Sequence, residues 1–201
     1  MKKQVSIILV LFCTTFMFAQ KADILKGDWK NLKGIKEFNL VFDYSNLEIP
    51  KFENEEAFLK DKMDKRNEKE PGDGERFKKS WFADREDRYE PKFIESFNKR
   101  WENNEVQVGK DLADAEYTIK IHTTFMYPGY NVGVMRQNSK IDAILSFYKN
   151  DNPSEIIFEI KYTKAEGYGA FGNDYNSGYR ISEAYAKLAK TFAAHLEKKA
   201  K

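Results

Sequence analysis

Two glycine-rich and tyrosine-rich segments hold the side chains best suited to ligand contact in this 201-residue sequence. They span residues 127–138 and 166–180. Tyrosine and phenylalanine offer rigid faces, and arginine, asparagine and aspartate offer directional hydrogen bonds, a combination typical of adaptable recognition surfaces. The candidate ligand-binding residues are Tyr127, Tyr130, Asn131, Arg136, Tyr168, Phe171, Asn173, Asp174, Tyr175, Tyr179 and Arg180.

A structural role for the same residues stays open. The rings could fold back over the end of a sheet, with the glycines providing the turns. Long irregular connections in a compact domain are, however, often functional.

The segment Gly167-Tyr168-Gly169-Ala170-Phe171-Gly172 has the spacing of the dinucleotide-binding fingerprint. In that motif the glycines open a helix within a parallel strand-helix-strand unit. Here a helix is expected only from about Tyr179, and no strand follows it. We therefore expect no nucleotide, and the sequence indicates no other cofactor.

Metal binding is not predicted either. His122 and His195 are the only two histidines, and Cys13 is the only cysteine, whereas transition-metal sites need several nitrogen or sulfur ligands. The segment from Asp174 to Gly178 alternates oxygen donors, but it departs from the calcium-loop pattern in its glycine position and lacks the closing acid.

The sequence assigns no catalytic residue. Asp84, Glu86 and Asp87 are neighbouring acids, but Arg85 and Arg88 stand among them. This pattern is typical of an ion-paired helix face. No nucleophile motif is present.

The elements that position these residues follow from hydrophobic periodicity. Alternating apolar residues predict strands at 38–44, 116–126, 141–147 and 155–164. Helices are predicted at 54–70, from 77 to 101 and at 181–196, and aromatic residues spaced by four in the second region, including Phe93 and Phe97, indicate core. The predicted fold class is α+β: a single, mainly antiparallel sheet of about four strands with helices on one face, in the order β-α-α-β-β-β-α.

The last three predicted strands fix where the two candidate segments lie. The turn Asn150-Asp151-Asn152-Pro153 is short, so the strands around it are expected to run antiparallel as a meander. The connections at 127–138 and 166–180 should then meet at the same end of the sheet.

Residues 1–19 resemble a secretory signal, with basic Lys2 and Lys3, an apolar run from Val5 to Phe18, and cleavage expected after Ala19. An uncleaved membrane anchor is the alternative. Cys13 lies inside the run and would leave with the signal. We expect an exported protein of the periplasm or the exterior, consisting of a polar leader at 20–34 and one domain at 35–201.

The balance and distribution of charged residues restrict the classes of partner that the protein could bind. Without Lys2 and Lys3 the 34 basic residues become 32, facing 32 acidic residues, and the signs are interspersed along the chain. A nucleic acid or an anionic membrane would require a field of one sign. We expect a protein, peptide or glycan partner, no nucleic acid, and no membrane insertion after signal cleavage.

The strand from Phe38 to Tyr44, the segment from Tyr127 to Val134 and the helix beginning Arg180-Ile181-Ser182-Glu183-Ala184-Tyr185 resemble uncharacterised secreted or periplasmic α/β proteins of Gram-negative bacteria. The order of elements is similar to small envelope domains of the TolB N-terminal type. The resemblance covers most of the chain after residue 19 and implies no activity.

The leading hypothesis is a non-catalytic exported binding or structural module of the bacterial envelope. The alternative is a glycan hydrolase with an unassigned acid pair. A carboxylate cluster in a cleft, with one acid buried, would favour the enzyme.

Overall fold

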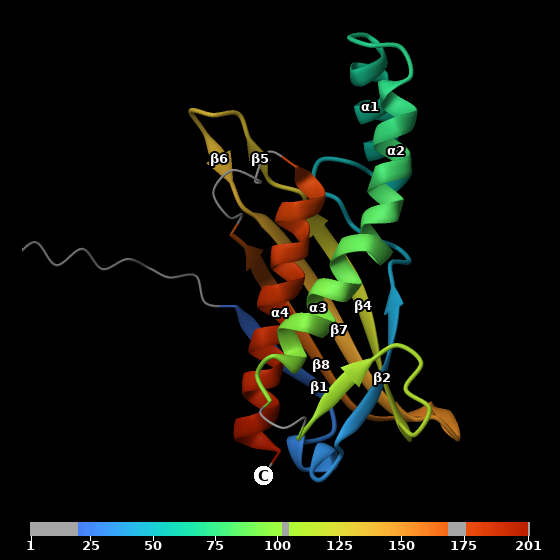
Figure 1. The fold of residues 1–201 in the computed structure, drawn as a ribbon, viewed down its shortest axis with the longest axis vertical. Coiled ribbons are helices and arrows are strands. Elements are labelled where there is room, and N and C mark those ends of the chain that lie inside the picture. The colour runs from blue at the N-terminus through green and yellow to red at the C-terminus, as the bar shows by residue number, and fades with distance from the viewer. Residues whose placement is uncertain (1–19, 102–104, 169–175, 201) are drawn as a thin grey trace, which may run out of the picture.

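The computed structural model describes residues 20–101, 105–168 and 176–200. It confirms an α+β fold (Figure 1). In chain order the elements are β1 (Lys21–Lys26), the 3-10 helix η1 (Trp29–Leu32), β2 (Glu37–Asp43), α1 (Glu55–Asn67), α2 (Asp73–Asp84), the π-helical η2 (Arg85–Tyr89), α3 (Glu90–Asn98), β3 (Gln107–Gly109), β4 (Tyr117–Tyr127), β5 (Tyr130–Asn131), β6 (Arg136–Gln137), β7 (Ser139–Lys149), β8 (Asn152–Gly167) and α4 (Ser177–Lys199).

The main sheet has six strands in the order β1-β8-β7-β4-β2-β3. β4, β7 and β8 form the expected antiparallel meander, with Ile121 opposite Leu145 and Leu145 opposite Ile160. β1 pairs antiparallel with β8. β2, however, runs parallel to both β4 and β3.

The prediction of about four strands in a mainly antiparallel sheet is therefore wrong, because the sheet is mixed and larger. β1 lies in the segment expected to be a polar leader, where apolar Ile24 and Leu25 are adjacent and do not alternate. β3 has only three residues, too few to show a period. β2 is parallel to β4 because the chain crosses over between them through the helices.

The order β-α-α-β-β-β-α is also wrong, since β1 precedes the first expected strand and β3 lies between the helices and the meander.

Helices α3 and α4 pack together and cover one face of the sheet (Figure 1). The core lies between these layers, where the Phe192 ring of α4 is 5.3 Å from Phe97 of α3 and 5.6 Å from Phe147 of β7. Phe93 and Phe97 are fully buried, as their spacing predicts. The opposite face of the sheet carries polar side chains such as the Lys120–Asp43 ion pair.

α1 and α2 form a helical hairpin that extends beyond the sheet (Figure 1). Asn54 caps α1, its Oδ1 accepting from the Ala57 amide at 2.8 Å. The break at Pro71-Gly72 reverses the chain, and Gly72 adopts φ +84°, which suits glycine. Asn67 Oδ1 ties the reversal by accepting from the amides of Gly72 and Gly74.

Within the described residues, no helix is long and apolar enough to cross a bilayer.

Candidate functional site

The described parts of the two candidate segments, 127–138 together with 166–168 and 176–180, meet at one end of the sheet, as the meander predicts. One links β4 to β7 and the other follows β8 toward α4. They are joined by a hydrogen bond from Asn138 Nδ2 to Glu166 Oε1 at 3.1 Å. Ser139 Oγ, at the start of β7, also donates to the Arg180 carbonyl in the first turn of α4.

Several candidate residues stabilise this end of the fold. Tyr127 donates its hydroxyl to Gln137 Oε1 at 2.6 Å, and Asn131 Oδ1 accepts from the Gly133 amide at 2.9 Å. These bonds hold the small β5–β6 hairpin. Arg136 and Tyr168 are exposed, with 63% of the Tyr168 surface accessible. Tyr130 and Tyr179 are half-buried.

The candidates Phe171, Asn173, Asp174 and Tyr175 lie outside the described residues.

Arg180 fastens the β4–β5 turn to α4. Its Nε donates to the Pro128 carbonyl and its Nη2 to the Gly129 carbonyl, both at 3.2 Å, and the residue is only 5% exposed. Gly129 has φ +66°, and a Cβ there would come within 2.4 Å of the Gln137 carbonyl oxygen. The turn is therefore held by a buried guanidinium in a conformation that needs glycine.

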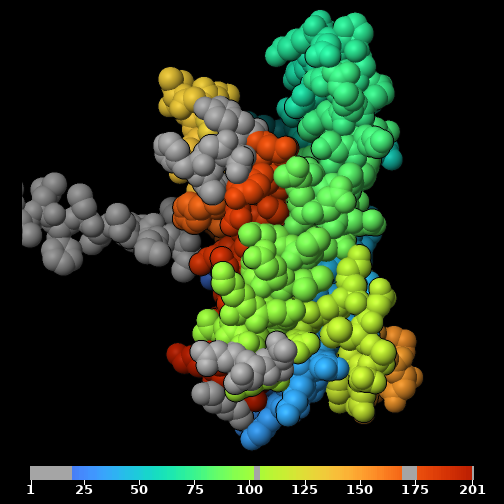
Figure 2. All heavy atoms as spheres, viewed as in Figure 1, coloured from blue at the N-terminus to red at the C-terminus, as the bar shows by residue number. Residues whose placement is uncertain are grey.

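A groove of about 820 Å³ lies between this end of the sheet and the α1–α2 hairpin. Figure 2 shows the hollow between the hairpin and the β5–β6 side of the molecule. The loop wall consists of Tyr127, Pro128, Gly129, Tyr130, Asn176, Ser177 and Arg180. The volume falls within the range of small-ligand sites.

The opposite wall is one face of α2 with part of α1. From α2 come Asp73, Phe77, Ser80, Trp81 and Asp84, whose spacing of three and four places them on one helix face. α1 contributes Phe58, Lys62 and Arg66.

The rings of this wall pack on one another. The Phe58 ring lies 4.8 Å from Trp81, 5.3 Å from Phe52 and 6.3 Å from Phe77. Two cations of α1 cover the cluster: Lys62 Nζ lies 5.6 Å from the Phe58 ring centre, and Arg66 Cζ lies 4.5 Å from that of Phe77.

A tight turn at Ile49-Pro50-Lys51-Phe52 forms the lip of the groove. The Phe52 amide donates to the Ile49 carbonyl at 3.2 Å. Proline at the second position and φ +73° at Lys51 are the features of a type II turn, in which glycine normally follows proline. Lys51 instead presents an exposed ammonium at the lip, without a carboxylate within 4.0 Å in the described part of the chain.

The two carboxylates of the groove differ in their environments. A hydrogen bond from Arg66 lowers the pKa of Asp73, which is also paired with Arg76. Burial raises the pKa of Asp84, despite the Arg88 Nε at 2.6 Å from its Oδ1. Asp84 also packs against Gly178 of α4, where a Cβ would come 1.9 Å from Oδ2.

A largely buried polar network links α1, α2 and η2 and stabilises the helical wall. Glu55 Oε1 accepts from Trp81 Nε1 at 2.6 Å and from Arg85 Nη2 at 2.5 Å. The Arg85 guanidinium lies 4.5 Å from the centre of the Tyr44 ring. Burial raises the pKa of the Tyr44 phenol well above its usual range. Arg85 belongs to η2, and π-helical turns occur often at functional sites.

Three of the nominated residues, Tyr127, Tyr130 and Arg180, line the loop wall, whereas Asn131, Arg136, Tyr168 and Tyr179 do not line the groove. No residue of the helical wall was nominated from the sequence. The aromatic residues of α2 were interpreted as core because of their spacing, and Trp81 is indeed buried. The missed signal is the placement of cations one turn from aromatics, as in Phe58 and Lys62 on α1.

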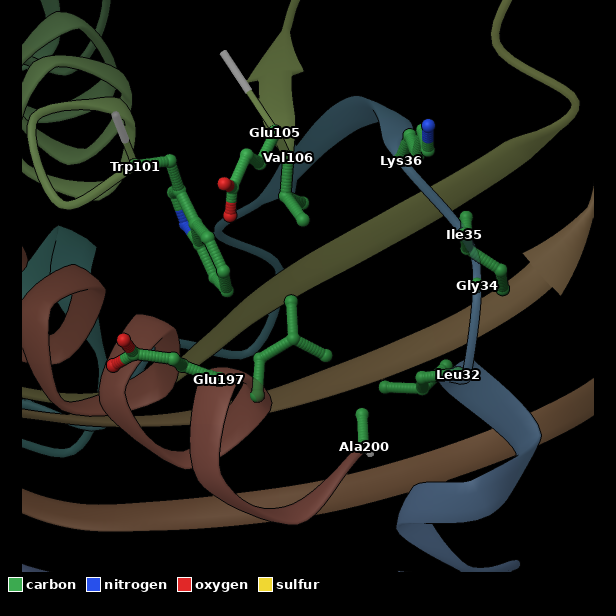
Figure 3. A pocket seen from close by; sticks show the side chains of 10 residues that line it. Leu32, Gly34, Ile35, Lys36, Trp101, Glu105, Val106, Glu197 and Ala200 are labelled. Carbon is green, nitrogen blue, oxygen red and sulfur yellow. The ribbon is translucent and has the colours of Figure 1, made fainter. Parts of the chain in front are cut away.

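A second cavity of about 450 Å³ lies at the other end of the molecule, where Trp101, Val106 and Glu197 surround it (Figure 3).

The two histidines lie apart. His122 Nε2 is 2.9 Å from the Ser45 carbonyl oxygen, and His195 Nδ1 is 2.9 Å from the Tyr162 hydroxyl. Within the described ranges, no group of three or more histidine, cysteine or acidic residues could hold a metal ion.

Comparison with family models, curated proteins and solved structures found no match to this chain.

Proposed function

We propose that this chain is an exported, non-catalytic binding module of the bacterial envelope, and that its ligand occupies the groove between the α1–α2 hairpin and the β4–β5 turn. The observation that carries the proposal is the groove itself. Three of the residues nominated from the sequence, Tyr127, Tyr130 and Arg180, line it.

Preorganisation supports a binding role. Arg180 holds the loop wall through two backbone carbonyls, and the Glu55–Trp81–Arg85 network holds the helical wall. A site whose walls are fixed before binding loses less entropy when a ligand arrives.

The pairing of the carboxylates favours binding over acid–base catalysis. Asp73 is engaged by two arginines and Asp84 by Arg88. A general acid or base must reach the reacting group within hydrogen-bond distance, and both carboxylates are already taken by guanidinium groups.

One observation favours a glycan hydrolase as a second candidate: Asp84 is a buried acid with a raised pKa, a property of catalytic acids. If Asp84 acts in this way, Asp84→Asn should abolish the release of reducing ends from cell-wall polysaccharides. Absence of such release by the unaltered protein would reject this candidate.

Export is part of the proposal. It rests on the basic residues followed by an apolar run in residues 1–19, and on the resemblance to Gram-negative envelope domains.

A substitution that fills the groove with a large side chain tests whether the ligand binds there. Ser80 is exposed on α2 and lines the groove, whereas Lys79 is exposed on the same helix and does not. Ligands found in a fragment screen of the protein should lose at least tenfold in affinity with Ser80→Trp and change less than twofold with Lys79→Trp. Equal affinities for the two variants would reject the groove as the binding site.

A further inference from the structure

We infer that the groove takes an acidic peptide segment of another protein. This inference rests on the proposed function and names the ligand class of the same site. The charges of the groove, the packing of its rings and its size favour this ligand class.

Cationic side chains outnumber carboxylates among the described residues that line the groove. Within that part of the chain, five cationic side chains line it and two carboxylates do. The cations come from three elements and the lip, so they do not belong to one helix face. They are Lys51, Lys62, Arg66, Arg76 and Arg180.

The cations near the rim keep part of their charge available to a ligand. Arg66 and Arg76 pair with Asp73, and Arg76 also pairs with Glu70, but the two arginine side chains stay 45% and 57% exposed. Lys62 pairs with Asp61 and stays 40% exposed. Lys51 has no carboxylate within 4.0 Å among the described residues. A carboxylate that enters the groove would therefore meet several partly solvated cations, which favours an anion and speeds its association.

The packing of the rings disfavours a sugar. Carbohydrate recognition by aromatic residues needs a free ring face, but the Phe58 ring is buried among its three aromatic neighbours. Lys62 lies over the rings of Phe52 and Phe58, and Arg66 lies over Phe77. The wall therefore offers ring edges and cationic groups, which suit an acidic side chain next to an apolar one.

The dimensions favour a short peptide. About 820 Å³ accommodates several side chains, and the two walls of the groove are built from separate segments. The half-buried rings of Phe52 and Phe77 on one side and Tyr130 on the other can receive an apolar side chain between the acids.

A selection from a displayed library of random octapeptides tests the inference. The protein serves as bait, and Ser80→Trp serves for counter-selection. We expect the enriched sequences to carry at least two acidic residues beside an aromatic or large aliphatic residue.

The selected peptides are then synthesised with a label, and their affinities for charge-removing variants test the role of the cations. Removing two charges with Lys51→Gln and Lys62→Gln together should weaken binding about fivefold. Lys60→Gln is the matched control, because Lys60 lies on α1, forms an ion pair and does not line the groove; it should change binding less than twofold. Raising the salt from about 50 mM to about 300 mM should also weaken binding.

The outcomes separate the two proposals. Enriched peptides without acidic residues that Ser80→Trp still excludes would overturn the acidic class and leave groove binding intact. Peptides that bind Ser80→Trp as well as the unaltered protein would overturn both. The absence of any enriched peptide, or tighter binding of trigalacturonate than of the best peptide, would overturn the assignment to a peptide.

Discussion

Lys51 occupies a backbone position that suits glycine better than lysine. Its φ of +73° lies in the left-handed region, which costs a residue with a Cβ about 1–2 kcal/mol. The turn retains this exposed residue at the lip of the groove. Residues in costly conformations concentrate at functional sites, and this position fits that pattern.

Replacing Lys51 with glycine should therefore stabilise the protein and weaken binding at the same time. Relief of the conformational cost, less the extra entropy of glycine in the unfolded chain, should raise the free energy of unfolding by about 0.5–1 kcal/mol. Urea denaturation measures this change. Lys51→Asn should keep much of the gain because asparagine tolerates this conformation. A loss of stability in both variants would contradict this view of the turn.

Asp43 should make the free energy of unfolding depend on pH in the acidic range. Burial raises the pKa of its carboxyl, but hydrogen bonds from Lys120 and from Ser45 outweigh burial and hold the pKa well below its usual range. Because the folded pKa is lower than the unfolded value of about 4, the carboxylate stabilises the fold above about pH 4. That contribution is lost as the pH falls below this value.

Asp43→Asn should accordingly lower the free energy of unfolding by about 1 kcal/mol at neutral pH and flatten its decline below about pH 4. Denaturation curves between about pH 3 and pH 7 provide the measurement. Asp151→Asn, in the exposed turn between β7 and β8, is the control. An unchanged slope for Asp43→Asn would show that other carboxylates account for the acid dependence.

The spacing of residues in the sequence predicted which side chains form the core better than it predicted which side chains line the groove. Phe93 and Phe97 repeat at helical spacing and are fully buried. The spacing of Phe77 and Trp81 is similar, yet it could not show that the same helix face also borders a cavity. Whether an apolar face is covered depends on the neighbouring element, which local spacing does not encode.

At the scale of elements, an ion pair links the start of α1 to η2, directly after α2. Arg85 Nη2 lies 2.5 Å from Glu55 Oε1, and each side chain is about one-fifth exposed. Removing one partner of such a pair leaves a poorly solvated charge. The orientation of the helical wall should therefore depend on both residues.

A double-mutant cycle measures this dependence. Arg85→Met should cost about 3 kcal/mol because it leaves the Glu55 carboxylate without its guanidinium partner. Glu55→Gln should cost less, since the amide oxygen can still accept from Trp81 Nε1. We expect a coupling energy of about 1–3 kcal/mol. Additive costs would mean that the two side chains act independently.

Element prediction succeeded where the period was long and failed where it was short. β4, β7 and β8 alternate over many residues, and their meander follows from the turn between β7 and β8. β1 and β3 are short edge strands, and they belong to the sheet because β8 and β2 offer them free backbone groups. Such pairing is a tertiary effect that sequence period cannot reveal.

At the scale of the whole molecule, the proposal of export has a direct consequence. When the full chain is produced in a Gram-negative bacterium, the protein should accumulate outside the cytoplasm and begin at Gln20, because cleavage is expected after Ala19. Mass spectrometry of the intact protein reads its N-terminus. A product that keeps residues 1–19 and sediments with membranes would support an uncleaved anchor instead.

The convergence of the two loops was the most informative whole-molecule prediction. It required only the antiparallel direction of three strands, and the bonds of Arg180 and Asn138 confirm it. The second wall could not be foreseen, since the placement of α1–α2 depends on the crossover between β2 and β4. The groove exists only because these two features meet.

Mapping of backbone amide shifts by NMR during titration with the selected peptides or fragment ligands locates the bound ligand on the protein. Binding in the groove should concentrate the shifts at the lip, on the groove face of α2 and in the β4–β5 turn, around Lys51, Phe77 and Gly129. Shifts concentrated around Leu32 and Ala200 at the second cavity, or scattered over the surface, would contradict it.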